Sequence, residues 1–258
     1  MSKKISLAAI STVLFDLDGT VYYGNRIIPG ANEAITLFRD LGKKIYFTTN
    51  NSFFSKKQVH QRLIDIGVQC KLEEVLTSGY MAAQYCSLHD IDDVFVFGSE
   101  NLINEFLDHG VLINQTDQAK NLVIGYNPNF NYEELTKAVR VAINSKNIIA
   151  CNRERVYPGK DAELYPGCGA MTAPVEWCSG KVCDIIIGKP NSAFVEIISR
   201  LDKIPASNIL MIGDTYESDI LMANRAGCPS VLISNECHED TFVIDSIVNI
   251  SKVFKDSL

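Results

Sequence analysis

Short apolar runs separated by stretches of helical periodicity are the feature that most restricts the fold of this chain. Residues 13–15 form one such run. Ala34, Phe38 and Leu41 then recur at the spacing of one helix face, and apolar character resumes at 44–47. Because continuous apolar runs are typical of strands buried on both faces, the pattern predicts a parallel sheet with helical crossovers.

The same alternation returns near the end of the chain. Three segments there are predicted as strands, each linked to the next by a helical pattern: 184–187, 209–212 and 231–233. The middle of the chain repeats the pattern on its own. Its strand-like runs lie at 94–97, 121–124 and 148–150, and its helical patterns at 102–107 and 132–143.

A chain of 258 residues is long enough for two domains with separate cores. The predicted fold class is α/β, with a Rossmann-like parallel-sheet core domain and an inserted smaller α/β cap domain. We assign residues 1–84 and 182–258 to the core and residues 85–181 to the cap.

Four chemically reactive side chains follow the predicted core strands. They are Asp16, Thr49, Lys189 and Asp214, each at or just after the carboxyl end of an apolar run. In an open parallel sheet, ligands bind outside the carboxyl ends of the strands. The sequence therefore predicts that these four residues converge at one edge of the core sheet.

Asp16 and Asp18 flank a turn in the segment FDLDGT. A calcium loop is excluded, because glycine already stands at its fourth position and Ile27 occupies the twelfth, where such loops need Glu. A plain Asp-Gly turn remains possible until Asp214 and Asp219 are considered. Carboxylates about 4 Å apart repel by about 4 kcal/mol at an effective dielectric near 20, so a cluster of them needs a cation, and Mg²⁺ suits it.

With Mg²⁺ screening its charge, Asp16 could attack phosphorus and form an aspartyl-phosphate. Asp18 would protonate the leaving oxygen and then activate water. Thr49 and Asn50 offer hydrogen-bond donors, and Lys189 a point charge, for the phosphate oxygens. Each signal alone is weak, since polar loops and solvated lysines are common, but four in chain order are specific.

The four motifs resemble those of the haloacid dehalogenase superfamily of phosphatases: DLDGT at 16–20, TTNNS at 48–52, GKP at 188–190 and GDTYESD at 213–219. IIPGA at 27–31 and YPGCGA at 165–170 make the chain similar to the 4-nitrophenylphosphatase subfamily, which carries a type IIA cap. The resemblance extends over nearly the whole chain.

The resemblance implies a role for each matched position. Asp16 would be the nucleophile and Asp18 the acid and base, with Thr49 and Lys189 completing the catalytic set. The implied phosphate-binding residues are Asp16, Leu17, Asp18, Thr49, Asn50, Asn51 and Lys189. Mg²⁺ would be held by the side chains of Asp16 and Asp214 and the backbone carbonyl of Asp18, with Asp219 as a further ligand or a partner of the ligands.

The chain departs from the family pattern in the predicted cap and after the last core strand. The differing segments are Gly125-Tyr126-Asn127, Cys151-Asn152-Arg153-Glu154 and Ser234-Asn235. These changes leave the identity of the substrate open. The side chains of Arg153, Arg155, Tyr157 and Lys160 either reach a substrate anion or form a solvated loop face.

Three functions share these motifs. The first is a phosphatase acting on small monoesters such as sugar phosphates, nucleotides or 4-nitrophenyl phosphate. The second is a phosphotransferase or mutase that passes the phosphoryl group to another hydroxyl. A non-catalytic phosphometabolite sensor ranks lower, because both Asp16 and Asp18 are present. A dehalogenase ranks lower still, since it needs neither Asp18 nor Mg²⁺.

Composition limits which partners the protein can bind and in which cellular compartment we expect it. A formal charge of −7 argues against a nucleic-acid surface, and no segment approaches the roughly 20 apolar residues that span a bilayer. The basic, then apolar start resembles a secretion signal, but Asp16 and Asp18 interrupt it. The eight cysteines are scattered, and Cys178 and Cys183 complete no zinc pattern. We expect a cytoplasmic enzyme for a small phosphorylated metabolite, and a homodimer through the cap is a family expectation.

Overall fold

The computed structural model of the chain describes residues 5–158 and 163–254. These residues divide into two compact units. The core unit comprises the chain up to Thr49, Val59–Leu76 and the chain from Lys189 onward, and the inserted unit comprises Asn50–Gln58 and Thr77–Gly188. The assignment of residues 85–181 to a functional cap, between core segments 1–84 and 182–258, stays a prediction.

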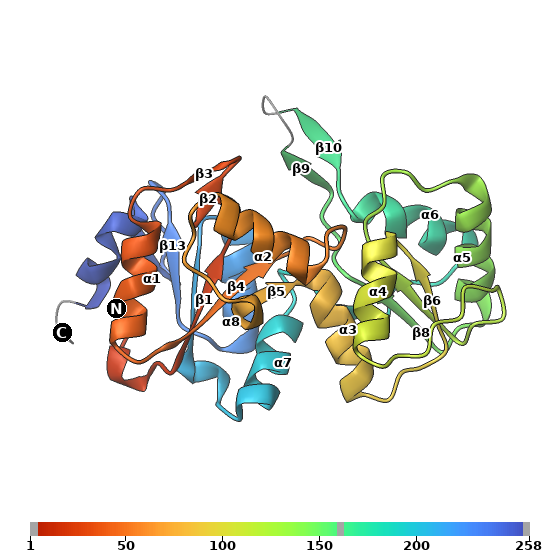
Figure 1. Cartoon of the computed structure of the whole chain (residues 1–258), viewed down its shortest axis with the longest axis horizontal. Coiled ribbons are helices and arrows are strands. Elements are labelled where there is room, and N and C mark those ends of the chain that lie inside the picture. Colours follow the sequence, from red (N-terminus) through yellow and green to blue (C-terminus); the bar gives the residue numbers. More distant parts are fainter. Residues whose placement is uncertain (1–4, 159–162, 255–258) are drawn as a thin grey trace. The chain divides into compact units, whose positions relative to one another are not determined.

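A six-stranded sheet forms the centre of the core unit (Figure 1), in the order β14-β13-β12-β1-β4-β5. The strands are β1 (Thr12–Asp16), β4 (Lys44–Thr49), β5 (Val75–Thr77), β12 (Ile209–Gly213), β13 (Ser230–Ile233) and β14 (Phe242–Ile244). β1 pairs in parallel with both β12 and β4, and its register places Asp16 opposite Thr48. The predicted parallel α/β fold is confirmed.

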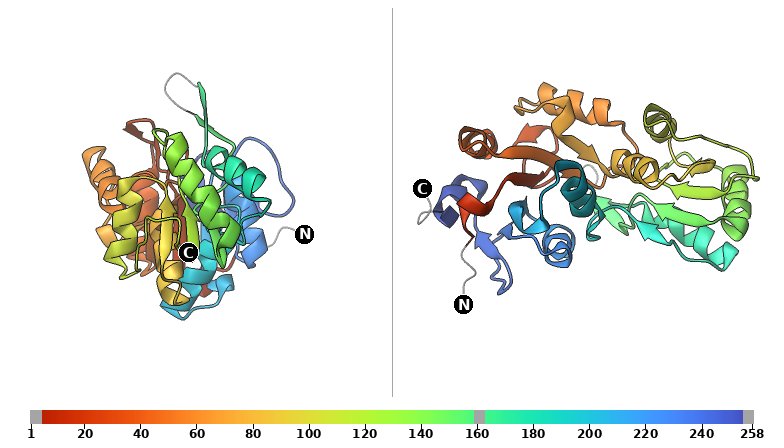
Figure 2. Two further views of the ribbon diagram at one scale, coloured as in Figure 1. Left: turned by 90° about the vertical axis from the view of Figure 1, so that its right-hand side faces the viewer. Right: turned by 90° about the horizontal axis from the view of Figure 1, so that it is seen from below.

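Helices cover both faces of this sheet (Figure 2). The α-helices are α1 (Ala31–Asp40), α2 (Lys56–Asp65), α7 (Ala193–Asp202) and α8 (Leu221–Ala226). Short 3-10 helices accompany them: η1 (Leu7–Ala9), η2 (Leu72–Glu74), η4 (Ala206–Asn208) and η6 (Ile247–Phe254). A π-helical turn, η5 (Tyr216–Ile220), precedes α8.

The side chains of β1 point alternately to the two faces of the sheet, and the hydrophobic core of this unit packs against them. Phe15 belongs to a cluster with residues of α1, α2 and η6, and its ring centroid lies 5.9 Å from that of Phe38 and 6.1 Å from that of Phe47. Leu14 is fully buried and lies on the opposite face, because successive side chains of a strand alternate. Asp16 is the last residue of this strand and is itself buried.

A small hairpin follows β1 directly. Its strands are β2 (Tyr22–Tyr23) and β3 (Arg26–Ile27), which pair antiparallel. Glycine supports the turn before it, because Gly19 has a φ of +89°. The strands of this hairpin are only two residues long, so the sequence shows no strand periodicity there.

The inserted unit has a parallel sheet of its own, in the order β11-β8-β7-β6. Its strands are β6 (Val94–Phe97), β7 (Asn121–Ile124), β8 (Asn147–Ala150) and β11 (Ile185–Ile186), and its helices are α3 (Ser78–Leu88), α4 (Glu100–Asp108), α5 (Tyr132–Asn144) and α6 (Gly169–Ser179). β9 (Val156–Pro158) and β10 (Leu164–Pro166) form an antiparallel pair. The apolar sides of α5 and α6 pack on Phe95, Leu122 and Ile148.

The strand before Lys189 corrects the sequence analysis. The run 184–187 was expected in the same sheet as the other three motif strands, but β11 pairs with β8 of the inserted unit. Periodicity shows that a segment is a strand and not which sheet it joins. β11 is a two-residue edge strand with both side chains half-buried, which fits its peripheral position. Lys189 is instead the first residue of the last core segment.

No helix within the described ranges is both long enough and apolar enough to cross a membrane.

Candidate active site

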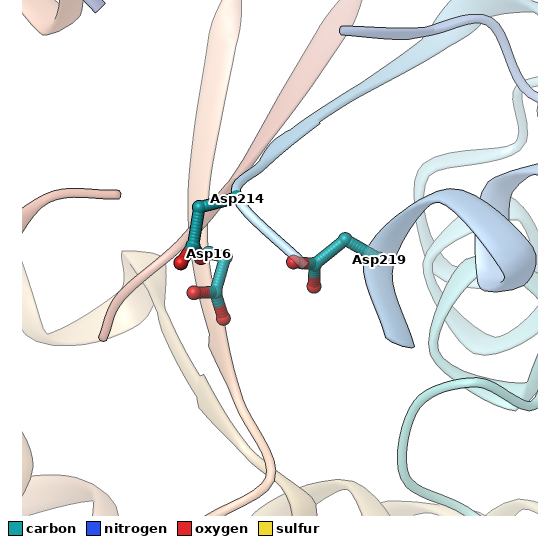
Figure 3. Close-up of side chains that lie close together, drawn as sticks. All are labelled: Asp16, Asp214 and Asp219. Atoms are coloured by element: carbon teal, nitrogen blue, oxygen red, sulfur yellow. The ribbon is translucent and has the colours of Figure 1, made fainter. Parts of the chain in front are cut away.

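Three aspartates of the core unit direct their carboxylates toward one another (Figure 3). Asp16 ends β1, Asp214 follows β12 and Asp219 lies in η5. One carboxylate oxygen from each lies within 4.8 Å of the other two. The strand ends supply Asp16 and Asp214 as the parallel sheet predicts, and the π-helical turn returns Asp219 to the same place.

Lys189 joins this cluster from the segment that re-enters the core unit. Its Nζ donates a hydrogen bond to Asp219 Oδ1 at 2.7 Å and another to Asp16 Oδ1. With all three carboxylates ionised, the three carboxylates and one ammonium carry a net charge of −2 in a place where Asp219 is fully buried and Lys189 is 4% exposed. The predicted convergence of Asp16, Lys189 and Asp214 therefore occurs, although Lys189 does not come from a core strand.

The electrostatics of the cluster follow from its burial. Burial raises the pKa of Asp16, and the charge of Lys189 opposes this only in part because Asp219 and Asp214 raise it again. Burial lowers the pKa of Lys189, but the attraction of Asp16 and Asp219 outweighs it and raises that pKa above its ordinary value. Lys189 is therefore charged, and the carboxylates still need further positive charge.

The carboxylate oxygens fit a divalent cation. Mg²⁺ takes oxygen ligands, is usually held by one or two carboxylates, and keeps waters that a substrate phosphate displaces. A charge of two positive matches the net charge of the cluster. Asp16 and Asp214 are the better candidates as ligands, because Asp219 is already engaged by other groups of the core unit.

Asp219 is held through both of its oxygens. Oδ1 accepts from Lys189 at 2.7 Å, and Oδ2 accepts from the backbone N–H of Thr215 at 3.2 Å. A Cβ on Gly213 would lie 2.3 Å from Asp219 Oδ2, so only glycine leaves room for this carboxylate. The geometry makes Asp219 the residue that orients Lys189.

Asp214 is framed by the DLDGT turn. The hydroxyl of Thr20 donates to Asp214 Oδ1 at 3.3 Å. A Cβ on Gly19 would lie 2.2 Å from Asp214 Oδ2, inside any real contact distance. Gly19 is therefore required twice, for its positive φ and for the close passage of the turn beside Asp214.

Asp18 lies two residues beyond Asp16 and is exposed. Its Oδ2 accepts a hydrogen bond from the hydroxyl of Tyr22 at 2.9 Å. Leu17 between the two aspartates is fully buried, and its carbonyl accepts from the backbone N–H of Val21 at 2.9 Å. The turn thus gives the two carboxylates different surroundings, as two different chemical roles require.

The TTNN segment is divided between the units. Thr49 is the last residue of β4, while Asn50 and Asn51 belong to the inserted unit. There, Asn50 Nδ2 donates to Glu154 Oε1 at 2.9 Å, and the Asn51 side-chain oxygen accepts from two following backbone N–H groups. The phosphate-binding roles of Leu17, Thr49, Asn50 and Asn51 stay predictions.

Two of the four predicted cap residues, Arg153 and Tyr157, have partners inside the inserted unit. Arg153 forms an ion pair with Glu176 at 2.6 Å, and the hydroxyls of Tyr157 and Tyr126 are 3.0 Å apart. Arg155 is exposed. Lys160 lies outside the described residues.

Three contacts made by residues in or beside the motifs were not anticipated. Thr20 contacts Asp214, Tyr22 contacts Asp18, and Glu154 contacts Asn50. Thr20 ends the DLDGT motif and Tyr22 lies two residues after it, so the only sequence signal for these two contacts is that the segment after Asp16 folds back as a turn. The pairing of Glu154 with Asn50 spans 104 residues, and local pattern does not reveal it.

Comparison with known proteins places the chain in a family. The family described as haloacid dehalogenase-like hydrolase matches residues 13–112, and a second, described as HAD-hydrolase-like, matches residues 186–256. The sugar-phosphatase AraL of Bacillus subtilis is 29% identical over 95% of this chain and 94% of its own. The acid sugar phosphatase of Staphylococcus haemolyticus is 30% identical over 84% of this chain and 82% of its own.

The fold agrees with these matches. The solved structure of p-nitrophenyl phosphatase from Archaeoglobus fulgidus superposes with a TM-score of 0.86 and 27% identity, over 94% of this chain and 98% of the other. The chain belongs to the haloacid dehalogenase-like hydrolases, and within them to the group of the 4-nitrophenyl phosphatases. It is a phosphoric monoester hydrolase, as its motifs predicted.

Proposed function

We propose that the protein is a Mg²⁺-dependent phosphatase that hydrolyses small phosphate monoesters through an aspartyl-phosphate on Asp16. The observation that carries the proposal is the cluster of Asp16, Asp214 and Asp219 with Lys189, whose net charge calls for a divalent cation beside a nucleophilic carboxylate. Relatives named for sugar phosphates and for p-nitrophenyl phosphate support a small substrate.

The side chains of Asp16 and Asp214 and the backbone carbonyl of Asp18 would hold the ion, with Asp219 as a further ligand or a partner of the ligands. Bound Mg²⁺ supplies positive charge that brings the phosphate oxygens next to a carboxylate that would otherwise repel them. Asp16 attacks phosphorus, and Asp18 gives a proton to the leaving oxygen. Water then attacks the phosphorus with Asp18 as base, which releases phosphate and restores Asp16.

The remaining residues bind the phosphate in this proposal. Lys189 stabilises the negative charge on the phosphoryl oxygens and its charge favours the ionised form of Asp16 against the effect of burial, and Asp219 holds Lys189 in place. Thr49, Asn50, Asn51 and the backbone N–H of Leu17 supply further hydrogen bonds to the oxygens.

Asp16→Asn tests the nucleophile. The variant keeps the size of the side chain and should lose turnover of 4-nitrophenyl phosphate by at least about 10³-fold, because the amide cannot accept the phosphoryl group. The wild type quenched in acid during turnover should carry one phosphate on Asp16 by mass spectrometry, and the variant none. Turnover by Asp16→Asn near the wild-type rate, or labelling at another residue, would refute the assignment.

The ion and the acceptor need separate measurements. Chelation should abolish phosphate release, Mg²⁺ should restore it, and calorimetry should detect Mg²⁺ binding without substrate. Addition of an alcohol or sugar acceptor distinguishes a phosphatase from a phosphotransferase or mutase. A phosphatase releases inorganic phosphate at an unchanged rate, whereas a transferase yields a new phosphate ester.

Substrate choice, compartment and assembly are further parts of the proposal. We infer that the segment 85–181 acts as a cap that selects among sugar phosphates, nucleotides and similar monoesters. We also infer a cytoplasmic enzyme, supported by eight cysteines that are all free thiols, and a homodimer through the cap. Phosphate release measured over a metabolite panel would identify the substrate, and light scattering would measure the mass.

A further inference from the structure

Tyr22 lies beside Asp18 in the turn that follows β1. Its hydroxyl donates to Asp18 Oδ2 at 2.9 Å, while the residue as a whole is 3% exposed and belongs to the core cluster. A tyrosine with a buried ring and its hydroxyl on a carboxylate is fixed at both ends. Tyr22 therefore restricts where the Asp18 carboxylate can lie.

Backbone hydrogen bonds of the turn set this geometry. The N–H of Tyr22 donates to the carbonyl of Leu17 at 3.1 Å, and the N–H of Gly19 donates to the carbonyl of Tyr22 at 2.8 Å. Tyr22 is also paired with Ile27 in the hairpin. The chain between Asp18 and Tyr22 is thus closed by main-chain contacts, so the hydroxyl meets the carboxylate without any long-range adjustment.

Arg62 supports the ring from α2. Its guanidinium carbon lies 4.9 Å from the centroid of the Tyr22 ring, a cation–π distance, and its Nη2 donates to the carbonyl of Gly24 at 2.9 Å. One side chain therefore contacts both the ring and the tip of the hairpin. This contact restricts the Tyr22 ring in addition to its packing in the core cluster.

We propose that Tyr22 is a positioning residue for Asp18, and that its hydroxyl on Oδ2 leaves Oδ1 as the oxygen that carries the transferred proton. The inference rests on the proposed function. In the first step the bond from Asp16 to phosphorus forms, the bond from phosphorus to the leaving oxygen breaks, and that oxygen takes the Oδ1 proton. In the second step water attacks phosphorus, its proton passes to Oδ1, and the bond to Asp16 breaks.

Tyr22→Phe tests this role, because it removes the hydroxyl and keeps the ring. The readout is kcat/KM for 4-nitrophenyl phosphate, phenyl phosphate and glycerol phosphate, since these leaving groups need protonation to increasing degrees. We expect losses of about tenfold for phenyl and glycerol phosphate and of less than about twofold for 4-nitrophenyl phosphate. A purely structural role would lower all three values equally. Tyr23→Phe, at a side chain that is 70% exposed, is the matched control and should change none of them.

Asp18→Asn separates the inference from the function on which it rests. It should show the same dependence on the leaving group with larger losses. Suppose that Asp18→Asn shows this dependence, but Tyr22→Phe lowers kcat/KM equally for all three substrates or for none of them. Tyr22 then has no positioning role, and Asp18 remains the proposed acid. If Asp18→Asn itself loses equally on all three, the proposed acid is wrong and the role of Tyr22 falls with it.

A second variant keeps the inference testable if Tyr22→Phe folds poorly in a thermal melt. Arg62→Gln changes an exposed side chain and removes the cation behind the ring. We expect the same order of losses across the three substrates, reduced to about twofold to threefold because the hydroxyl remains. Unchanged kcat/KM for all three substrates in Arg62→Gln would then count against the role of Tyr22.

Discussion

Gly19→Ala adds one methyl group beside the site, and this group has two separate effects: strain in the backbone and a clash with Asp214. The φ of Gly19 is +89°, a conformation that costs an L-residue about 1–2 kcal/mol. The new Cβ would also lie 2.2 Å from Asp214 Oδ2 and 2.6 Å from Asp214 Cγ. Since ordinary contacts begin near 3.4 Å, the Asp214 carboxylate has to move by about 1 Å.

A displacement of that size at a group proposed to hold Mg²⁺ should be costly. Misplacing a catalytic group by about 1 Å lowers the rate by about 100-fold, or about 2.7 kcal/mol. We therefore expect Gly19→Ala to lose about 100-fold in kcat/KM, to need more Mg²⁺ for half-maximal activity, and to lose only about 1–2 kcal/mol of stability. Steady-state kinetics over a Mg²⁺ series and denaturant unfolding measure the three quantities.

Gly42→Ala is the matched control. Gly42 has a φ of +69°, and a Cβ there would meet no atom within 4 Å. It should therefore show the same backbone cost with full activity. If Gly19→Ala retains activity within about threefold of Gly42→Ala at every Mg²⁺ concentration, the contact with Asp214 has no catalytic consequence and the reasoning is refuted.

Two further predictions concern the charges of the cluster. Lys189→Met leaves its carboxylates unpaired and should cost about 3–5 kcal/mol of stability without Mg²⁺, part of which Mg²⁺ restores. Lys43→Met is the control, because the hydrogen bonds of Lys43 in the described part of the chain go to backbone carbonyls, and Mg²⁺ should not change the stability of this variant. If Mg²⁺ shifts the thermal melts of both variants equally, the charge argument is wrong. Asp214→Asn should weaken Mg²⁺ binding in calorimetry by about tenfold or more, and Asp219→Asn much less, because Asp219 serves Lys189. The reverse order would make Asp219 the ligand.

The sequence predicts much of the fold because the core strands are short and buried on both faces. β1, β4 and β12 lie where the apolar runs indicate, and each ends at its motif residue or one residue before it. The prediction failed for β11, since a short apolar run such as 185–187 does not reveal which of two parallel sheets it joins. It also missed the hairpin after β1, whose two-residue strands show no periodicity.

The residues of the site were also predictable in part. The motif residues were found because a parallel sheet brings strand ends together, and the side chains of Asp16, Lys189 and Asp214 do lie in one cluster. Which carboxylate binds which partner was not predictable. The engagement of Asp219 by Lys189 and by the N–H of Thr215 depends on the path of η5, and a pattern of residue types does not contain that path.

The π-helical turn η5 imposes a condition of length. Asp214 and Asp219 both face the cluster because η5 is wound more widely than an α-helix, with the N–H of Leu221 reaching the carbonyl of Tyr216. Removal of one residue from this interval would turn Asp219 by about 100° around the helix axis and away from Lys189. Natural variation here should therefore exchange the exposed residues Thr215 and Glu217 freely while keeping the count of residues constant.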